Sequence, residues 1–131
     1  MKSTVRLDEG YTPTGKNAPV QLRSGKLRRL IHPDTVKSQN IGVAVLTMNP
    51  GDEVAPHYHK TREEVYFILS GEGISTHRYK NGEEETVRYV KGLSIYLPMG
   101  TVHDIKVAGN EPLEILVIAS PALPMDDSYL A

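Results

Sequence analysis

Short apolar runs separated by tight turns dominate the chain from residue 41 onward. The runs are rich in β-branched and aromatic residues, and such short segments are typical of strands rather than helices. Asn81-Gly82 lies between two of them and indicates a hairpin, because both residues tolerate the positive φ of a type I′ turn. Pro50-Gly51 similarly predicts a type II turn. The runs predict strands at 41–48, 54–59, 64–70, 73–79, 84–90, 93–97, 102–107 and 113–119.

Turns recur about every ten residues, and we find no confident helix in the pattern, which favours an all-β fold, an antiparallel barrel or sandwich. The first 35 residues differ, because prolines and glycines interrupt every longer apolar run there. We therefore expect an irregular N-terminal arm over 1–35, packed on the barrel or on a partner subunit. A single β domain is expected over 36–131.

The amino-acid composition narrows the range of possible functions. A chain of 131 residues corresponds to about one domain. The absence of cysteine excludes disulfides, iron–sulfur clusters and a cysteine nucleophile. With 15 basic and 16 acidic residues the charge is balanced, which disfavours nucleic acid as a partner. The sequence shows neither an apolar leader nor a run of about 20 apolar residues, so we expect a cytoplasmic protein without a membrane partner.

Three of the five histidines lie where the strand and turn signals are densest. His57 and His59 are two positions apart in a predicted strand and therefore share a face. Glu64 begins the next strand, so a hairpin can bring its carboxylate opposite both imidazoles. Divalent transition metals accept such a set of ligands. Taken singly, a strand histidine is more often a hydrogen-bonded structural residue than a ligand, and that interpretation stays open on spacing alone.

The spacing of these residues and of several glycines resembles the two motifs of the cupin superfamily. The first motif is matched by Gly51, His57, His59, Glu64 and Gly71. The second is matched by Gly92, Pro98, Gly100 and His103. The resemblance implies an antiparallel jelly-roll (cupin) β-barrel. It also implies one divalent transition metal (Mn, Fe, Zn, Ni, Co or Cu), bound by His57, His59, Glu64 and His103.

Two positions depart from that pattern. Val107 stands where the second motif usually ends in asparagine, and Leu93 stands where many small cupins have aspartate. Neither position is a metal ligand in the family. The departures weaken the transfer of any particular subfamily's function, and leave the expected metal site unchanged.

Strand alternation predicts what lines the pocket around the metal. Tyr66 and Ile68 share the face of Glu64, and Ile105 shares that of His103, which gives a mostly apolar cavity with few polar groups. Tyr66 is the candidate catalytic residue, with simple packing of its ring as the alternative. The facing of three further polar residues stays undetermined: His77, Arg78 and Tyr96. His32, in the irregular arm, is interpreted as having no special role.

The leading functional hypothesis is a mononuclear metal-dependent enzyme acting on a small polar metabolite, by isomerase, epimerase, lyase or dioxygenase chemistry. A non-catalytic cupin that binds a small ligand or a sugar is the alternative, and a structural metal in a dimerisation module is a third. Val65, Phe67 and Leu69 make the other face of the 64–70 strand apolar, so we expect the opposing sheet, the N-terminal arm or a second subunit to cover it. Cupins are commonly dimers, and we expect a homodimer.

Overall fold

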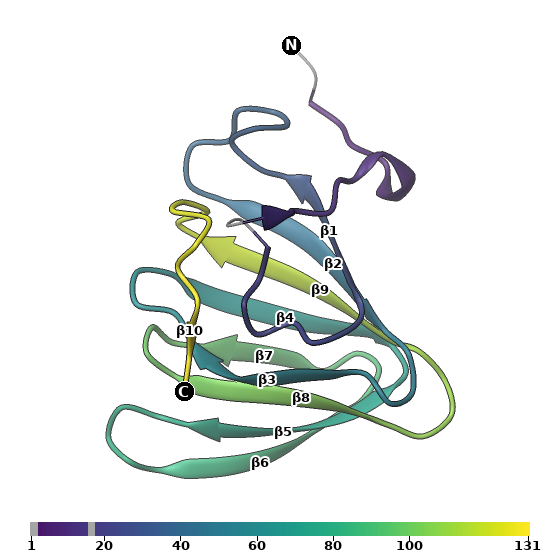
Figure 1. The fold of residues 1–131 in the computed structure, drawn as a ribbon, viewed down its shortest axis with the longest axis vertical. Coiled ribbons are helices and arrows are strands. Elements are labelled where there is room, and N and C mark those ends of the chain that lie inside the picture. Colours follow the sequence, from purple (N-terminus) through teal and green to yellow (C-terminus); the bar gives the residue numbers. More distant parts are fainter. Residues whose placement is uncertain (1–2, 16–17) are drawn as a thin grey trace.

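The structure, a computed structural model, describes residues 3–15 and 18–131. Within these ranges it is built almost entirely of antiparallel strands (Figure 1). The elements are η1 (Leu7–Glu9), β1 (Lys26–Ile31), β2 (Gly42–Met48), β3 (Glu53–Tyr58), β4 (Glu63–Ser70), β5 (Glu72–Arg78), β6 (Glu84–Tyr89), β7 (Ser94–Leu97), β8 (Val102–Ala108), β9 (Leu113–Ser120) and β10 (Tyr129–Leu130). No helix in the described residues is long and apolar enough to span a membrane.

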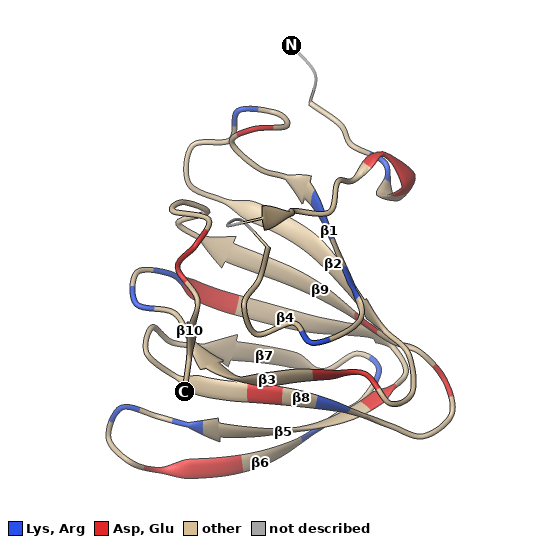
Figure 2. Ribbon diagram, in the orientation of Figure 1, with Lys and Arg blue, Asp and Glu red and all other residues tan. Residues whose placement is uncertain are grey.

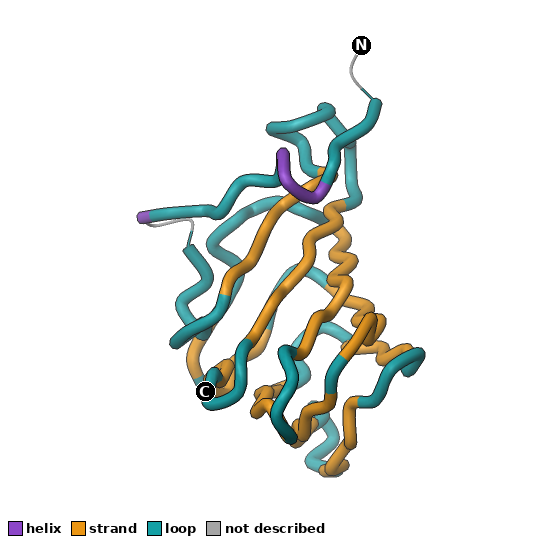
Figure 3. Tube along the Cα trace, turned by 90° about the vertical axis from the view of Figure 1, so that its right-hand side faces the viewer, coloured by secondary structure: helices purple, strands orange, loops and turns teal. Residues whose placement is uncertain are grey.

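The strands form two five-stranded sheets, ordered β1-β2-β9-β4-β7 and β10-β3-β8-β5-β6. The sheets face each other, and the loops gather at the strand ends (Figures 1 and 3). Basic residues of β1 and acidic residues of β6 lie at opposite ends of this arrangement (Figure 2). The predicted all-β, antiparallel jelly-roll class is confirmed, in the form of a two-sheet sandwich.

The eight predicted strands correspond in order to β2–β9. In β4 the side chains of Glu64, Tyr66 and Ile68 are buried, whereas Phe67 and Leu69 are exposed, as alternation predicts. The buried faces of both sheets meet in one apolar core. Its members are Leu46, Met48, Val54, Tyr66, Ile68, Tyr89, Ile95, Leu97, Ile105, Leu113 and Ile115.

The expectation of an irregular arm up to residue 35 is wrong for one segment. Lys26–Ile31 forms β1, which pairs with β2 from Lys26↔Thr47 to Ile31↔Val43. Its sequence mixes basic and apolar residues, so it carries a weak strand signal, and pairing with β2 decides its structure. Upstream, Tyr11 exchanges two backbone hydrogen bonds with Arg29, which places this part of the arm against β1 of its own chain.

Two turns show how far turn chemistry can be read from sequence. At the end of β2 the N–H of Asp52 donates to the carbonyl of Asn49, and Gly51 has a φ of 91°, as a type II turn requires. Between β5 and β6 the predicted hairpin exists, but Gly82 alone has a positive φ. The predicted type I′ turn is therefore wrong, and the loop instead ends in a left-handed glycine.

Candidate metal centre

Three buried imidazoles converge between the two sheets. His57 lies in β3 and His103 in β8, and the two are register partners across that strand pair. His59 follows directly after β3. One ring nitrogen from each lies within 4.8 Å of those of the other two. The spacing-based prediction that these histidines come together is correct, and this cluster could hold a metal ion.

Backbone carbonyls orient all three rings. The Nδ1 atoms of His57 and His103 lie 2.8 and 2.9 Å from the carbonyl oxygens two residues earlier. For His59, the partner is the carbonyl oxygen of Asp127, at 2.6 Å. A carbonyl can only accept, so each Nδ1 carries a proton, and each Nε2 is the ring nitrogen left to bind a metal. Metal-binding histidines are usually held in this way.

Glu64 completes the cluster from β4 of the opposite sheet. Its Oε1 atom lies 3.0 Å from Nε2 of His59 and 3.7 Å from Nε2 of His103. Atoms that share one metal lie roughly 3–4 Å apart, because each metal–ligand bond is about 2.1 Å long. The three Nε2 atoms and Oε1 of Glu64 are buried without a hydrogen-bond partner in the structure. The three imidazole nitrogens could therefore hold a metal ion, with the Glu64 oxygen beside two of them.

The protonation states also suit metal binding. Burial lowers the pKa of His57 to about 2, with the neighbouring His103 and His59 adding to the effect. The ring is therefore neutral near pH 7. Burial on its own would raise the pKa of Glu64, but the adjacent histidines and Arg62 outweigh it and hold the pKa well below its usual value. His57 therefore offers a neutral imidazole and Glu64 an ionised carboxylate, the forms that bind metals.

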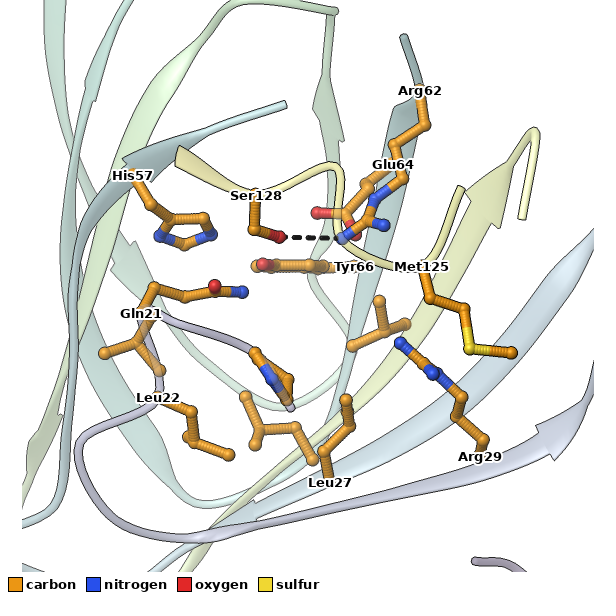
Figure 4. A pocket seen from close by; sticks show the side chains of 14 residues that line it. Gln21, Leu22, Leu27, Arg29, His57, Arg62, Glu64, Tyr66, Met125 and Ser128 are labelled. Carbon is orange, nitrogen blue, oxygen red and sulfur yellow. Dashed lines mark hydrogen bonds and ion pairs between the residues drawn. The ribbon is translucent and has the colours of Figure 1, made fainter. Parts of the chain in front are cut away.

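A cavity opens beside this cluster (Figure 4). Tyr66 lies in it, with its ring 5.9 Å from that of His103 in an edge-on arrangement. Burial raises the pKa of Tyr66 well above its ordinary value, and the nearby Glu64 raises it further, so the hydroxyl stays protonated. Tyr66 therefore points into the cavity, as predicted, and presents a hydrogen-bond donor there.

The other predicted pocket residues do not line this cavity. Ile68 and Ile105 share the correct faces, but both are fully buried in the core. Leu46, Val54 and Val117 contribute to the cavity wall from β2, β3 and β9, and much of the rest comes from β1, from the arm before it and from the C-terminal tail. These residues are Pro19, Gln21, Leu22, Leu27 and Arg29, with Met125 and Ser128.

Two arginines in the wall were not predicted as site residues. Arg62 is buried, with its Nε atom 3.4 Å from Oε2 of Glu64 and its Nη2 donating to Ser128 Oγ at 3.3 Å. Arg29 extends from β1 toward the same cavity (Figure 4). Strand alternation in β1 places Arg29 on the same inward face as Leu27, so the sequence carries a signal for Arg29 once Lys26–Ile31 is taken as a strand.

Asp127 is a third site residue that the sequence did not predict. Its carboxylate is buried and accepts hydrogen bonds from the N–H groups of Lys60 and Thr61, at 3.0 and 2.9 Å, and from the Thr61 hydroxyl, at 2.6 Å. Together with the bond to His59, these contacts fix the tail against the loop that follows β3. No local motif marks this residue, because its partners lie far away in the sequence.

The three residues of undetermined facing lie outside this cavity. His77 is buried, and its Nε2 lies 3.0 Å from the Tyr89 hydroxyl. Arg78 is exposed and lies 4.0 Å from a Glu84 oxygen. Tyr96 is 55% exposed on β7. None of the three lines the cavity beside the histidine cluster.

The comparisons with known proteins agree with this fold. The model of the cupin domain family matches residues 44–119, more than half of the chain. The protein belongs to the cupin family. A relative from Methanocaldococcus jannaschii, the uncharacterized protein MJ1618, is 33% identical over 120 residues, covering 91% of this chain and 92% of that protein.

More distant similarities lead to proteins with named activities. The tetracenomycin polyketide synthase protein TcmJ of Streptomyces glaucescens is 27% identical over 82% of this chain and 68% of its own length. A structure of oxalate decarboxylase OxdC from Bacillus subtilis matches with a TM-score of 0.72, 26% identity and 95% coverage of this chain. This chain spans only 30% of that one. Another study of OxdC concerns its Mn(II) centres.

Proposed function

We propose that the protein is a mononuclear metal-dependent enzyme that acts on a small polar metabolite in the cavity beside the histidine cluster. One observation carries the proposal: three buried imidazole nitrogens converge beside this cavity, next to the Glu64 carboxylate, without hydrogen-bond partners of their own. A divalent transition metal held there would supply Lewis-acid chemistry, polarising a carbonyl or hydroxyl of the substrate. The likeness to OxdC, with its Mn(II) centres, supports manganese as the first metal to test.

The surrounding residues have separate roles in this proposal. Tyr66 donates a hydrogen bond to a substrate oxygen, or a proton during the reaction, because its hydroxyl stays protonated. Arg62 holds the second oxygen of Glu64 and so directs the first toward the histidines. Isomerase, epimerase, lyase and dioxygenase reactions all fit this arrangement, and the substrate decides among them.

The test combines metal loading with a search for turnover. Protein loaded with Mn, Fe, Zn, Ni, Co or Cu is incubated with a panel of small hydroxy acids, oxo acids and sugar phosphates, and products are followed by NMR. We expect conversion of one class by the metal-loaded protein and loss of that conversion in Glu64→Gln. Tight binding of a panel member with no turnover under any metal would favour the alternative, a ligand-binding cupin.

We also propose a homodimer, formed through the outward face of β4. Phe67 and Leu69 are 36% and 38% exposed there, and Val65 lies beside them. In register, Val65 pairs with Ile118 of β9 on one side and with Tyr96 of β7 on the other. The apolar surface is therefore continuous across three strands, which favours its burial against a second copy.

A further inference from the structure

Arg29 is a buried positive charge without a matching negative charge. It occupies an inward position of β1 and is only 8% exposed. Its Nη1 atom has no hydrogen-bond partner. Among the described residues, no carboxylate forms an ion pair with it. Burying an unpaired guanidinium is costly, so a structure that retains one needs a reason.

The acidic group that shares Tyr11 with Arg29 is already engaged. Asp34 accepts a hydrogen bond from the Tyr11 hydroxyl and lies 2.6 Å from Nδ1 of His32. Arg29 acts on Tyr11 itself, where it lowers the pKa against the larger, opposite effect of burial and that of Asp34. The guanidinium therefore has a neutral hydroxyl beside it, and its remaining donors are directed elsewhere.

Those donors face the cavity of the metal centre. Arg29 lines this cavity and a second one beside it, and Arg62 and Glu64 line both as well. Figure 4 shows Arg29 and Arg62 on one side of the first cavity, with His57 across from them. Each cavity holds about 50 Å³ of free space, which is room for a small group only. His32, with its Nε2 buried and unpartnered, lines the second cavity too.

The two arginines differ in whether a carboxylate balances their charge. Arg62 is compensated by Glu64, at 3.4 Å, whereas Arg29 is not compensated. A divalent metal on the three histidines would make the cavity still more positive. A neutral ligand would leave this positive charge unbalanced, whereas an anionic ligand would balance it.

We propose that Arg29 binds an anionic group of the ligand, a carboxylate or a phosphate, and so restricts the substrate to small organic anions. The proposal rests on the proposed function only in taking that ligand to be the substrate. A guanidinium matches the planar fork of a carboxylate or two oxygens of a phosphate through paired hydrogen bonds. Arg29 is then a binding residue placed across the cavity from the histidine cluster.

Binding to variants of the full chain tests this, both with and without metal. The probes are glycolate and malonate, inorganic phosphate, and glycerol as a neutral control, measured by calorimetry. We expect at least one anion to bind the wild type and Arg29→Gln to weaken that binding by about 10-fold or more, with Arg29→Lys intermediate. Arg28→Gln removes the same charge from the neighbouring position of β1, and should change affinity by less than about twofold.

A second readout separates ligand binding from a structural role. If Arg29 serves a ligand, Arg29→Gln should leave the melting temperature of the ligand-free protein unchanged or higher, because it removes an unmatched buried charge. A clear fall in that temperature would mean that Arg29 is retained for folding, and would overturn the proposal. So would equal anion affinity in wild type and Arg29→Gln, or binding of glycerol as tight as that of the anions.

The metal content of the same samples separates this inference from the proposed function. Arg29→Gln should keep the metal content of the wild type, because Arg29 is not among the donor atoms of the cluster. A wild-type protein that takes up no metal even after loading, but still binds anions through Arg29, would contradict the proposed enzyme. The anion site would still be supported. Unequal binding of the carboxylates and of phosphate then identifies which group the substrate carries.

Discussion

His59 and Asp127 stand 68 residues apart in the sequence, yet Nδ1 of the imidazole donates to the Asp127 carbonyl oxygen at 2.6 Å. The carboxylate of the same aspartate accepts hydrogen bonds from Lys60 and Thr61, immediately after the histidine. One residue of the C-terminal tail therefore fixes both the loop and the ring. As a result, Nε2 of His59 stays directed at the other members of the cluster.

Asp127→Asn should weaken both the fold and the metal site. The amide nitrogen replaces one acceptor oxygen and meets a backbone N–H group, so the tail loosens. We expect a loss of about 1–3 kcal/mol of unfolding free energy and a fall in metal affinity of about 10–100-fold. Urea denaturation and metal titration measure the two effects. Asp126→Asn, at the exposed neighbouring position, is the matched control, and equal behaviour of the two variants would contradict the role of Asp127.

Acid should destabilise the metal-free protein through His57. The pKa of this residue is 6.5 in the ordinary case and about 2 in the folded protein. Between these values the unfolded chain binds a proton that the folded chain does not, so stability is complete above pH 6.5 and falls toward pH 2. Each pH unit should cost about 1.4 kcal/mol from this residue. Denaturant unfolding of chelator-treated protein at pH 7, 6, 5 and 4 measures the slope.

His57→Asn serves as the control for the pH series, because asparagine does not titrate. Its stability should depend less steeply on pH than that of the wild type, whatever its absolute stability. Parallel slopes for the two proteins would mean that His57 is protonated in the folded state.

Tyr66→Phe should separate chemistry from metal binding. The variant lacks only the hydroxyl that faces the cavity, and Tyr66 offers no atom to the histidine cluster. We expect normal metal content and a fall in turnover of about 100-fold or more, if the hydroxyl donates a proton. Tyr79→Phe, in the loop after β5, where the tyrosine hydroxyl donates to Glu85 outside the cavity, should change neither quantity. A Tyr66→Phe protein that turns over normally would leave the ring with a packing role only.

Phe67→Asp tests the proposed dimer. A carboxylate in the centre of the outward face of β4 would be buried against a second copy at high cost. The variant should therefore have the mass of a monomer by light scattering at micromolar concentration, with its metal content retained. Ile74→Asp changes an equally exposed residue of the other sheet and should leave the dimer intact. A wild type that is already monomeric under these conditions would refute the dimer.

Sequence reasoning worked best where the determinants are local. Turn residues delimit β2–β9, and alternation assigns Glu64 and Tyr66 to one face of β4. Prediction from sequence failed where long-range contacts decide the structure. β1 is a strand because β2 lies beside it, and Arg29 becomes a cavity residue only through that pairing. Asp127 lies in a tail whose local sequence gives no sign of the histidine that it contacts.

The metal content of the protein tests the central claim most directly. Elemental analysis is made on wild type purified without added metal and again after loading, alongside a His57→Ala/His59→Ala double variant and His77→Gln. His77 is a buried histidine outside the cluster and so controls for loss of any imidazole. We expect about one divalent ion per chain in the wild type and in His77→Gln, and almost none in the double variant. Equal metal content in the wild type and the double variant would contradict the assignment of this site.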